Sequence, residues 1–213
     1  MSEFCGLCDI KACDTGDVEH YPPDCPSRHS CVTNALKQYR DKTDLRIAQN
    51  AALTEWEGYC IHTRLEETVL FFKRAGYQRI GIAYCAGFKR EMKVIGRVFT
   101  HHKFDIYPII CKCGSIPKEE IGMSDEKGKI HPGSFEAMCN PIGQAAYLNE
   151  VETEYNVLLG LCVGHDSLFL RHSDAPATIL AVKDRVCGHA TMIPVYQAEG
   201  YYRDKLFPEQ TSL

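Results

Sequence analysis

The alternation of short apolar runs with helical patterns beyond residue 77 constrains the fold of this chain most strongly. Buried parallel strands appear in sequence as short, nearly continuous apolar runs, and the helices that connect them show a period of about 3.6 residues. We expect strands over 79–85, 105–113, 155–162 and 177–184, and helices over 88–103 and 142–151. Strands that alternate with helices predict a three-layer α/β domain, which is a Rossmann-like parallel sheet with crossover helices.

Cysteine residues stand at the predicted carboxyl ends of three of these strands. They are Cys85, the pair Cys111 and Cys113, and Cys162. Cys139 precedes a helix at the end of the loop 114–138, so it can reach the same edge. Because open parallel sheets bind ligands at this edge, we expect these thiols to hold a cluster there, with the loop closing over it. One of Cys111 and Cys113 would be a ligand, and the other would lie behind it or bind substrate.

A second set of thiols lies near the amino terminus, in a segment rich in Gly, Asp and Pro. Cys5, Cys8, Cys13 and Cys25 have the spacing C-x2-C-x4-C-x11-C. Four thiolates satisfy either a tetrahedral zinc ion or a four-iron cluster. The spacing matches neither paired CxxC motifs nor a standard ferredoxin motif, and we favour iron–sulfur over zinc. We expect this knuckle to fasten the amino-terminal segment to the α/β body. Cys31 fits a ligand or a packed residue equally well.

Composition indicates in which compartment the protein works and which classes of partner it does not bind. The chain has 213 residues, 12 cysteines and a net charge of −4, which leaves no electrostatic footprint for nucleic acid or an anionic membrane. It shows no signal peptide and no apolar run of about 20 residues, so we expect a cytoplasmic protein. Thiols in a reducing compartment act as metal ligands, catalytic groups or small buried residues more often than as disulfides.

We predict three segments along the chain. Residues 1–31 form the cysteine-rich knuckle, residues 32–76 form a helical segment packed on the body, and residues 77–213 form the α/β domain. Helical spacing predicts packing for apolar residues of the middle segment, namely Leu45, Ala48, Ala52, Trp56, Leu65, Val69 and Phe72. The pattern assigns no role to Cys60 or Cys187.

Polar residues after the third and fourth predicted strands are candidates for proton transfer. The segment CVGHDS places His165 and Asp166 at the start of a helix, and AVKDRVCGH places Lys183 and His189 after the fourth strand. An imidazole beside a carboxylate is a suitable proton donor. In the alternative interpretation, Asp166 only caps the helix and the charged side chains are solvated.

Several longer motifs carry a family resemblance. The opening thiol pattern with PPDCP, together with CNPIGQAAYLN, GLCVGHDSLF and APATILAVKDRVCGH, resembles the DUF1847 family of uncharacterised, cysteine-rich bacterial and archaeal proteins associated with metal binding. The resemblance implies a metal-ligand role for Cys5, Cys8, Cys13 and Cys25. It also supports Cys85, Cys111, Cys113, Cys139 and Cys162 as site residues, but it implies no substrate.

Two classes of function follow. In the first, the chain is an iron–sulfur enzyme with one or two 4Fe–4S clusters that acts on a small molecule, with redox, Lewis-acid or desulfidase-type chemistry and an electron donor or substrate as partner. In the second, it is a metal or sulfur carrier or sensor. A zinc-stabilised domain without catalysis is a further alternative. The pattern leaves the oligomeric state open.

Overall fold

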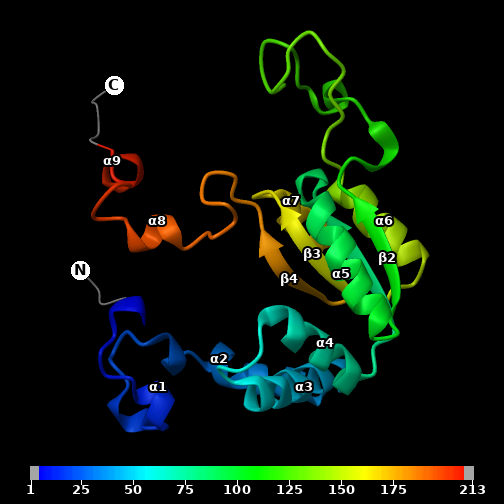
Figure 1. The fold of residues 1–213 in the computed structure, drawn as a ribbon. Helices are drawn as coiled ribbons and strands as arrows, with labels where there is room; N and C mark the ends of the chain where they lie inside the picture. Colours follow the sequence, from blue (N-terminus) through cyan, green and yellow to red (C-terminus); the bar gives the residue numbers. More distant parts are fainter. Residues whose placement is uncertain (1–4, 209–213) are drawn as a thin grey trace. The chain divides into compact units, whose positions relative to one another are not determined.

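A computed structural model describes residues 5–208 of the chain. The chain divides into two compact units, with the boundary between Ile61 and His62 (Figure 1). Within the described residues, no helix combines the length and apolar character that a membrane-spanning segment needs.

The first unit consists of short helical turns followed by one long helix. Its elements are η1 (Cys5–Leu7), α1 (Ala12–Thr15), η2 (Val18–His20), η3 (Pro26–Arg28), α2 (Ser30–Asn34), η4 (Ala35–Arg40) and α3 (Lys42–Gly58). Asp41 begins α3, because its side chain accepts hydrogen bonds from the backbone N–H groups of Thr43 and Asp44 at 2.8 and 3.1 Å.

Several apolar residues of α3 are exposed within the first unit, and their packing on the α/β body stays a prediction. Trp56 is 77% exposed and Leu45 is 39% exposed. Among residues 5–61, the buried side chains are few, and they include Ala12 and Thr54. The first unit therefore offers no apolar core of its own for these side chains to enter.

The second unit contains a four-stranded, all-parallel sheet. Its strands are β1 (Arg79–Tyr84), β2 (Asp105–Ile110), β3 (Tyr155–Leu161) and β4 (Ala177–Val182), in the order β2-β1-β3-β4. This confirms the predicted α/β class and the four predicted strands. The second strand ends earlier than predicted, because the chain turns into η6 (Cys113–Ser115), where Gly114 has a φ of 80°.

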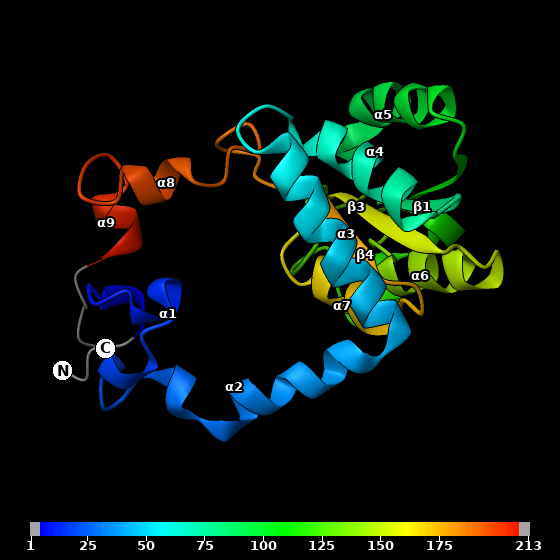
Figure 2. The same cartoon turned by 90° about the horizontal axis from the view of Figure 1, so that it is seen from below.

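Helices cover both faces of this sheet. Figure 2 shows α4 (Arg64–Ala75) and α5 (Lys89–His101) on one face, with α6 (Pro141–Glu150) and α7 (His165–His172) on the other. Beyond β4 the chain continues through the short helices α8 (Ile193–Tyr196) and α9 (Arg203–Leu206). The sheet between two helical layers confirms the predicted Rossmann-like arrangement.

Aromatic side chains fill the layer between α4, α5 and the sheet. Phe72 is completely buried, and its ring centroid lies 5.3 Å from that of Tyr155 and 5.9 Å from that of Phe99. Every residue of β3 is buried, as expected for an inner strand covered on both faces. Val69 and Phe72 are thus packed as predicted.

The strand order places a topological switch point beside β1. The chain leaves β1 for β2 through α5, and later returns to the opposite side of β1 as β3. The loops at the carboxyl ends of β1 and β3 diverge at such a point, which leaves space for a ligand. Cys85 follows β1 and Cys162 follows β3 directly, so both thiols stand at this position.

Candidate functional site

The first unit brings the four predicted amino-terminal ligands to one cavity. Cys5, Cys8, Cys13 and Cys25 all line a cavity of about 200 Å³, and Lys11 is also part of its wall. Cys31 is exposed in α2 and does not line this cavity. The four thiols that the resemblance implies as ligands therefore share this cavity, and the fifth thiol of the segment lies outside it.

Backbone geometry explains how thiols so far apart in sequence reach one cavity. The N–H of Cys8 donates to the carbonyl oxygen of Cys5 at 3.2 Å, which closes a tight turn. The Arg28 side chain donates to the carbonyl oxygens of Tyr21 and Pro22, the latter at 2.8 Å, and so fixes the turn that carries Cys25. Loop hydrogen bonds, rather than a hydrophobic core, thus shape the knuckle.

The second unit brings three strand-edge thiols together. The side chain of Cys111, directly after β2, interacts with the thiols of both Cys85 and Cys139, and these interactions shift the pKa values of all three. The backbone N–H of Ala86 also donates to the sulfur of Cys111, at 3.3 Å. Cys85 and Cys111 are buried and Cys139 is half-buried. Sulfur atoms from two strand ends and from the start of α6 therefore meet, as the predicted topology requires.

The interactions among the three thiols lower the pKa of two of them and raise the pKa of the third. The interaction with Cys111 lowers the pKa of Cys85 to about 5, and Lys183 and the backbone N–H of Gly87 act in the same direction. The interaction with Cys111 likewise lowers the pKa of Cys139 to about 5. The same contacts raise the pKa of Cys111 above its usual range. Cys85 and Cys139 are thus the more acidic members of the group, and Cys111 retains its proton.

Cys162 and Cys113 take different places. The Cys162 sulfur accepts a hydrogen bond from the Arg185 guanidinium at 3.4 Å, and Arg185 also interacts electrostatically with Cys85 and Cys139. Cys113 instead donates to the carbonyl oxygen of Asn140 at 3.7 Å, and burial raises its pKa. Of the CKC pair, Cys111 is the member that contacts the other strand-edge thiols.

Cationic groups surround Cys85 and Cys139. Lys183 interacts with Cys85, whereas Lys112 and His165 both lower the pKa of Cys139. Lys112, between the two cysteines of the CKC pair, is a site residue that the sequence reasoning missed. Its position between two candidate ligands was the available signal.

The remaining candidates for proton transfer lie in different settings. Asp166 accepts a hydrogen bond from the N–H of the adjacent Ser167 at 2.8 Å, whereas the N-cap of α7 is Gly164. His189 has a φ of 72°, and its Nδ1 accepts from the N–H of Asp184 at 3.1 Å. Its ring lies 4.4 Å from that of Phe88, between centroids. His189 is therefore held in place by its backbone and by an aromatic contact.

Phe88 connects the thiol site with the polar residues after β4. The Lys183 ammonium lies 4.6 Å from the centre of the Phe88 ring, so Lys183 and His189 both contact this ring. Phe88 also packs directly against Gly160 of β3, where a β-carbon would lie 1.9 Å from the ring. The absence of a side chain at residue 160 thus allows Phe88 to stand beside Cys85.

The loop between Cys111 and Cys139 is a structured arm at the carboxyl edge of the sheet (Figure 1). A short antiparallel stem forms its base, where Pro117 pairs with Ala137 and the N–H of Met138 donates to the carbonyl oxygen of Ile116 at 2.8 Å. The loop also contains η7 (Lys118–Ile121).

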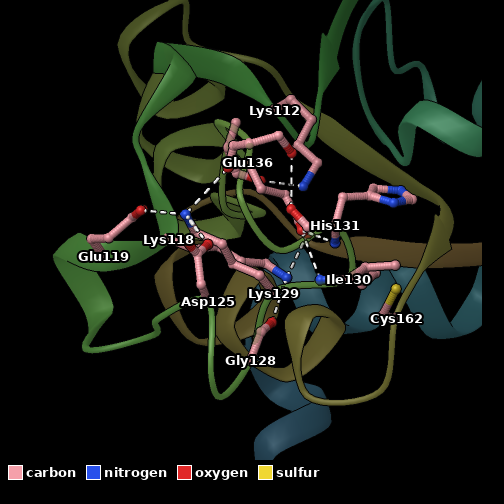
Figure 3. A network of polar contacts seen from close by, with 12 residues as sticks. Lys112, Lys118, Glu119, Asp125, Gly128, Lys129, Ile130, His131, Glu136 and Cys162 are labelled. Atoms are coloured by element: carbon pink, nitrogen blue, oxygen red, sulfur yellow. Dashed lines mark hydrogen bonds and ion pairs between the residues drawn. The ribbon is translucent and has the colours of Figure 1, made fainter.

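Ion pairs fix the rest of this arm (Figure 3). Lys118 pairs with Glu136 at 2.6 Å, and this contact holds the pKa of Glu136 at about 2. Lys129 pairs with Glu119 and Asp125 at 2.5 and 2.9 Å. These ion pairs join loop residues to one another. That the loop closes over the thiols stays a prediction.

The arrangement of donors differs from that of a preformed metal site. Among residues 5–208, no group of three or more His, Cys, Asp or Glu side chains is gathered closely enough to hold a metal ion. When such thiols bind one metal ion, each sulfur lies about 2.3 Å from it. Their chemistry nevertheless fits soft metals, because thiolates select zinc, copper(I) and iron–sulfur clusters.

Removing the Cys111 thiol tests the proton arrangement in metal-free protein. In a Cys111→Ala variant, we expect the pKa values of Cys85 and Cys139 to rise from about 5 towards 9, because the interaction that lowers them is gone. Thiolate absorbance or alkylation rates measured against pH would report the shift, with Cys60→Ala as the control for an exposed thiol.

The same variant has a consequence for stability. A lowered thiol pKa stabilises the fold above the unfolded pKa, and this contribution is lost as the pH falls through about 5. The free energy of unfolding of the variant should therefore increase less than that of the wild type between pH 5 and 9. Unchanged thiol titration in the variant would contradict the arrangement.

Comparisons with known proteins place the chain in one family. It matches the DUF1847 family, described as proteins of unknown function, over residues 25–180. It is similar to an uncharacterised protein of Methanocaldococcus jannaschii, with 40% identity over 202 residues that cover 95% of this chain and 97% of that protein. No solved structure matches. The chain belongs to the DUF1847 family, as its cysteine and strand-end motifs suggest.

Proposed function

We propose that this chain is a thiolate-ligated metal protein whose strand-edge site binds an iron–sulfur cluster and acts on a small molecule. The observation that carries the proposal is the meeting of Cys85, Cys111 and Cys139, with two thiols whose pKa values lie near 5. Metal ligation by cysteine requires the thiolate, and the site already favours that form at neutral pH.

The charge around the thiols supports an anionic cluster. Lys183 interacts with Cys85, Arg185 with Cys162 and Lys112 with Cys139, so each of these sulfur atoms has a cationic neighbour. A thiolate-ligated cluster carries net negative charge, and such cations reduce its self-repulsion. With Cys85, Cys139 and Cys162 as ligands, Cys111 can serve as the fourth ligand or as a proton holder beside them.

The polar residues support chemistry on a small molecule. When bound, a cluster with an open iron supplies Lewis-acid or redox chemistry. The chain itself supplies three polar groups. His165 interacts electrostatically with Cys139. Lys183 and His189 both contact the Phe88 ring. These groups can orient an anionic substrate and exchange protons with it. The topological switch point is the usual place for such a ligand.

The knuckle supports a second metal centre, of iron–sulfur or zinc type. Its four thiols line one cavity of about 200 Å³. The exposure of Cys5 and Cys13 favours one further function, that of a metal carrier, because accessible thiolates can exchange their metal with a partner. We therefore keep transfer of metal as the second candidate.

Anaerobic purification with iron, sulfide and zinc analysis tests the proposal. For the wild type we expect broad absorption near 400 nm and about four irons per cluster. The Cys139→Ser variant should lose the strand-edge metal, and the Cys8→Ser variant should lose the knuckle metal. Cys60→Ser is the matched control, because Cys60 is exposed and lines neither site.

Three outcomes distinguish the candidates. Loss of iron and sulfide in Cys139→Ser, but not in Cys60→Ser, supports the strand-edge cluster. Zinc without sulfide in the wild type selects the structural alternative. Wild-type metal content in Cys139→Ser would overturn the strand-edge site, and metal that passes readily from the knuckle to a chelator would favour the carrier.

A further inference from the structure

A surface groove runs between α5 and the edge strand β2, away from the thiols. It has a volume of about 690 Å³, and Met92, Gly96, Ile106 and Pro108 contribute its apolar floor. Its charged lining residues are cationic, and it has no carboxylate in its lining. The charge of this groove is thus opposite to the net charge of −4 of the whole chain.

The cations of the groove form a regular row. Lys89, Lys93 and Arg97 line it and recur every fourth residue along α5, and His101 follows at the same spacing. On an α-helix, this spacing places the three charges about 6 Å apart and makes the row about 12 Å long. Lys103 adds a further positive charge at the same end as His101.

The row is not compensated within the described part of the chain. The side chains of Lys89, Lys93 and Arg97 are exposed and form no ion pair with any residue between 5 and 208. Like charges four residues apart destabilise a helix. The helix therefore carries an unfavourable pattern that nothing in the fold requires.

Gly96 is a second unfavourable choice on the same helix. Glycine in a helix interior is less stable than alanine. A β-carbon at Gly96 would lie 3.4 Å from Met92 and 3.5 Å from Ile106, which are ordinary contact distances, so the core does not demand glycine here. Because Gly96 has no side chain, the groove is deeper at this position. The row of like charges and the helix-interior glycine both reduce the stability of α5. When such unfavourable features occur at the same place, they indicate a functional surface.

We propose that this groove binds an extended acidic segment of a partner protein, with acidic and apolar residues in alternation. Along an extended chain, every second side chain recurs after about 6.7 Å, which is close to the spacing of the cations. Acidic side chains on one side can meet the row, while the intervening apolar side chains enter the floor over Gly96.

The apolar floor favours a peptide over a nucleic acid. Single strands of nucleic acid bind where several aromatic rings can stack on the bases. Tyr84 is the one aromatic side chain in the groove lining. The net negative charge of the chain also disfavours a long polyanion, whereas a short acidic segment needs only the local row.

Fluorescence anisotropy with synthetic peptides tests the proposal on the full-length protein. The probe is a labelled peptide in which four glutamates alternate with three leucines. One control peptide has the same composition, with all its glutamates placed before the leucines. A second control has lysine in place of glutamate, and a labelled oligothymidylate reports nucleic acid binding.

Two variants address the two parts of the groove. Lys93→Glu/Arg97→Glu reverses the row, and Gly96→Leu fills the floor. Each should weaken binding of the alternating peptide about tenfold or more. The matched control is Lys37→Glu/Arg40→Glu, which makes the same change of charge at exposed residues of η4 and should leave binding unchanged. Circular dichroism confirms that each variant is folded.

The outcomes are decisive in both directions. Stronger binding of the alternating peptide than of either control peptide, lost in both groove variants, supports the site. Equal binding of the two glutamate peptides, or binding that Gly96→Leu leaves unchanged, would mean that only unspecific charge attraction acts and would overturn it. Tighter binding of the oligothymidylate would also overturn it, in favour of a nucleic acid site.

Discussion

The Gly160→Ala variant is expected to be less stable than the wild type by about 2–5 kcal/mol in the free energy of unfolding of the second unit. Gly160 has a φ of 68°, which costs alanine about 1–2 kcal/mol. In addition, the new β-carbon would lie 1.9 Å from the Phe88 ring, so the ring must move. Overpacking of this kind adds about 1–3 kcal/mol. Denaturant unfolding followed by circular dichroism measures the change.

A matched glycine separates the two causes. Gly76 has a similar φ of 73°, but a β-carbon there would meet nothing within 4 Å. Gly76→Ala should therefore show only the backbone cost. If Gly160→Ala were no more destabilising than Gly76→Ala, the close packing of Phe88 on β3 would be wrong. Because Phe88 follows Cys85 closely, we also expect the alkylation rate of Cys85 to change only in Gly160→Ala.

The Phe72→Ala variant should lose about 3–5 kcal/mol of unfolding free energy. Phe72 is completely buried and lies at the centre of an aromatic cluster, with Phe104 and Tyr155 at centroid distances of 5.7 and 5.3 Å. Its removal leaves a cavity that rigid neighbouring rings cannot fill. Thermal or denaturant unfolding measures the loss.

The control for this prediction is an aromatic residue outside the core. Phe207 is 63% exposed, and Phe207→Ala should change the unfolding free energy by less than about 0.5 kcal/mol. A loss of less than about 1 kcal/mol in Phe72→Ala would contradict the packing of α4 on the sheet.

The strands and their edges were predictable because their signal is local. A strand buried on both faces appears as a continuous apolar run, and Cys85, Cys111 and Cys162 stand where those runs end. Parallel strands have their carboxyl ends at one edge, so the proximity of Cys85 and Cys111 was predictable without knowledge of the strand order. The order β2-β1-β3-β4 itself was not predictable, because no single segment encodes the direction of each crossover.

Other features depended on contacts between distant segments. The choice of Cys111 over Cys113 follows from the turn at Gly114 and from the contact of Cys113 with Asn140. The contacts of Phe88 with Gly160 and His189 join three segments far apart in sequence. A local signal was also overlooked, since Thr63 and Glu66 form the capping box that starts α4 and divides the helical segment.

The stem at the base of the arm between Cys111 and Cys139 has an entropic consequence. An unstructured chain between two contacting residues costs more conformational entropy as it lengthens, by about 0.6 kcal/mol for each doubling. Here the pairing of Pro117 with Ala137, and of Lys118 with Glu136, closes most of that chain before the two thiols meet. Only the short segments between the stem and the thiols contribute to the closure. The length and sequence of the outer arm are thereby uncoupled from the geometry of the sulfur atoms, and this part of the chain can diverge among relatives without altering the thiol contact.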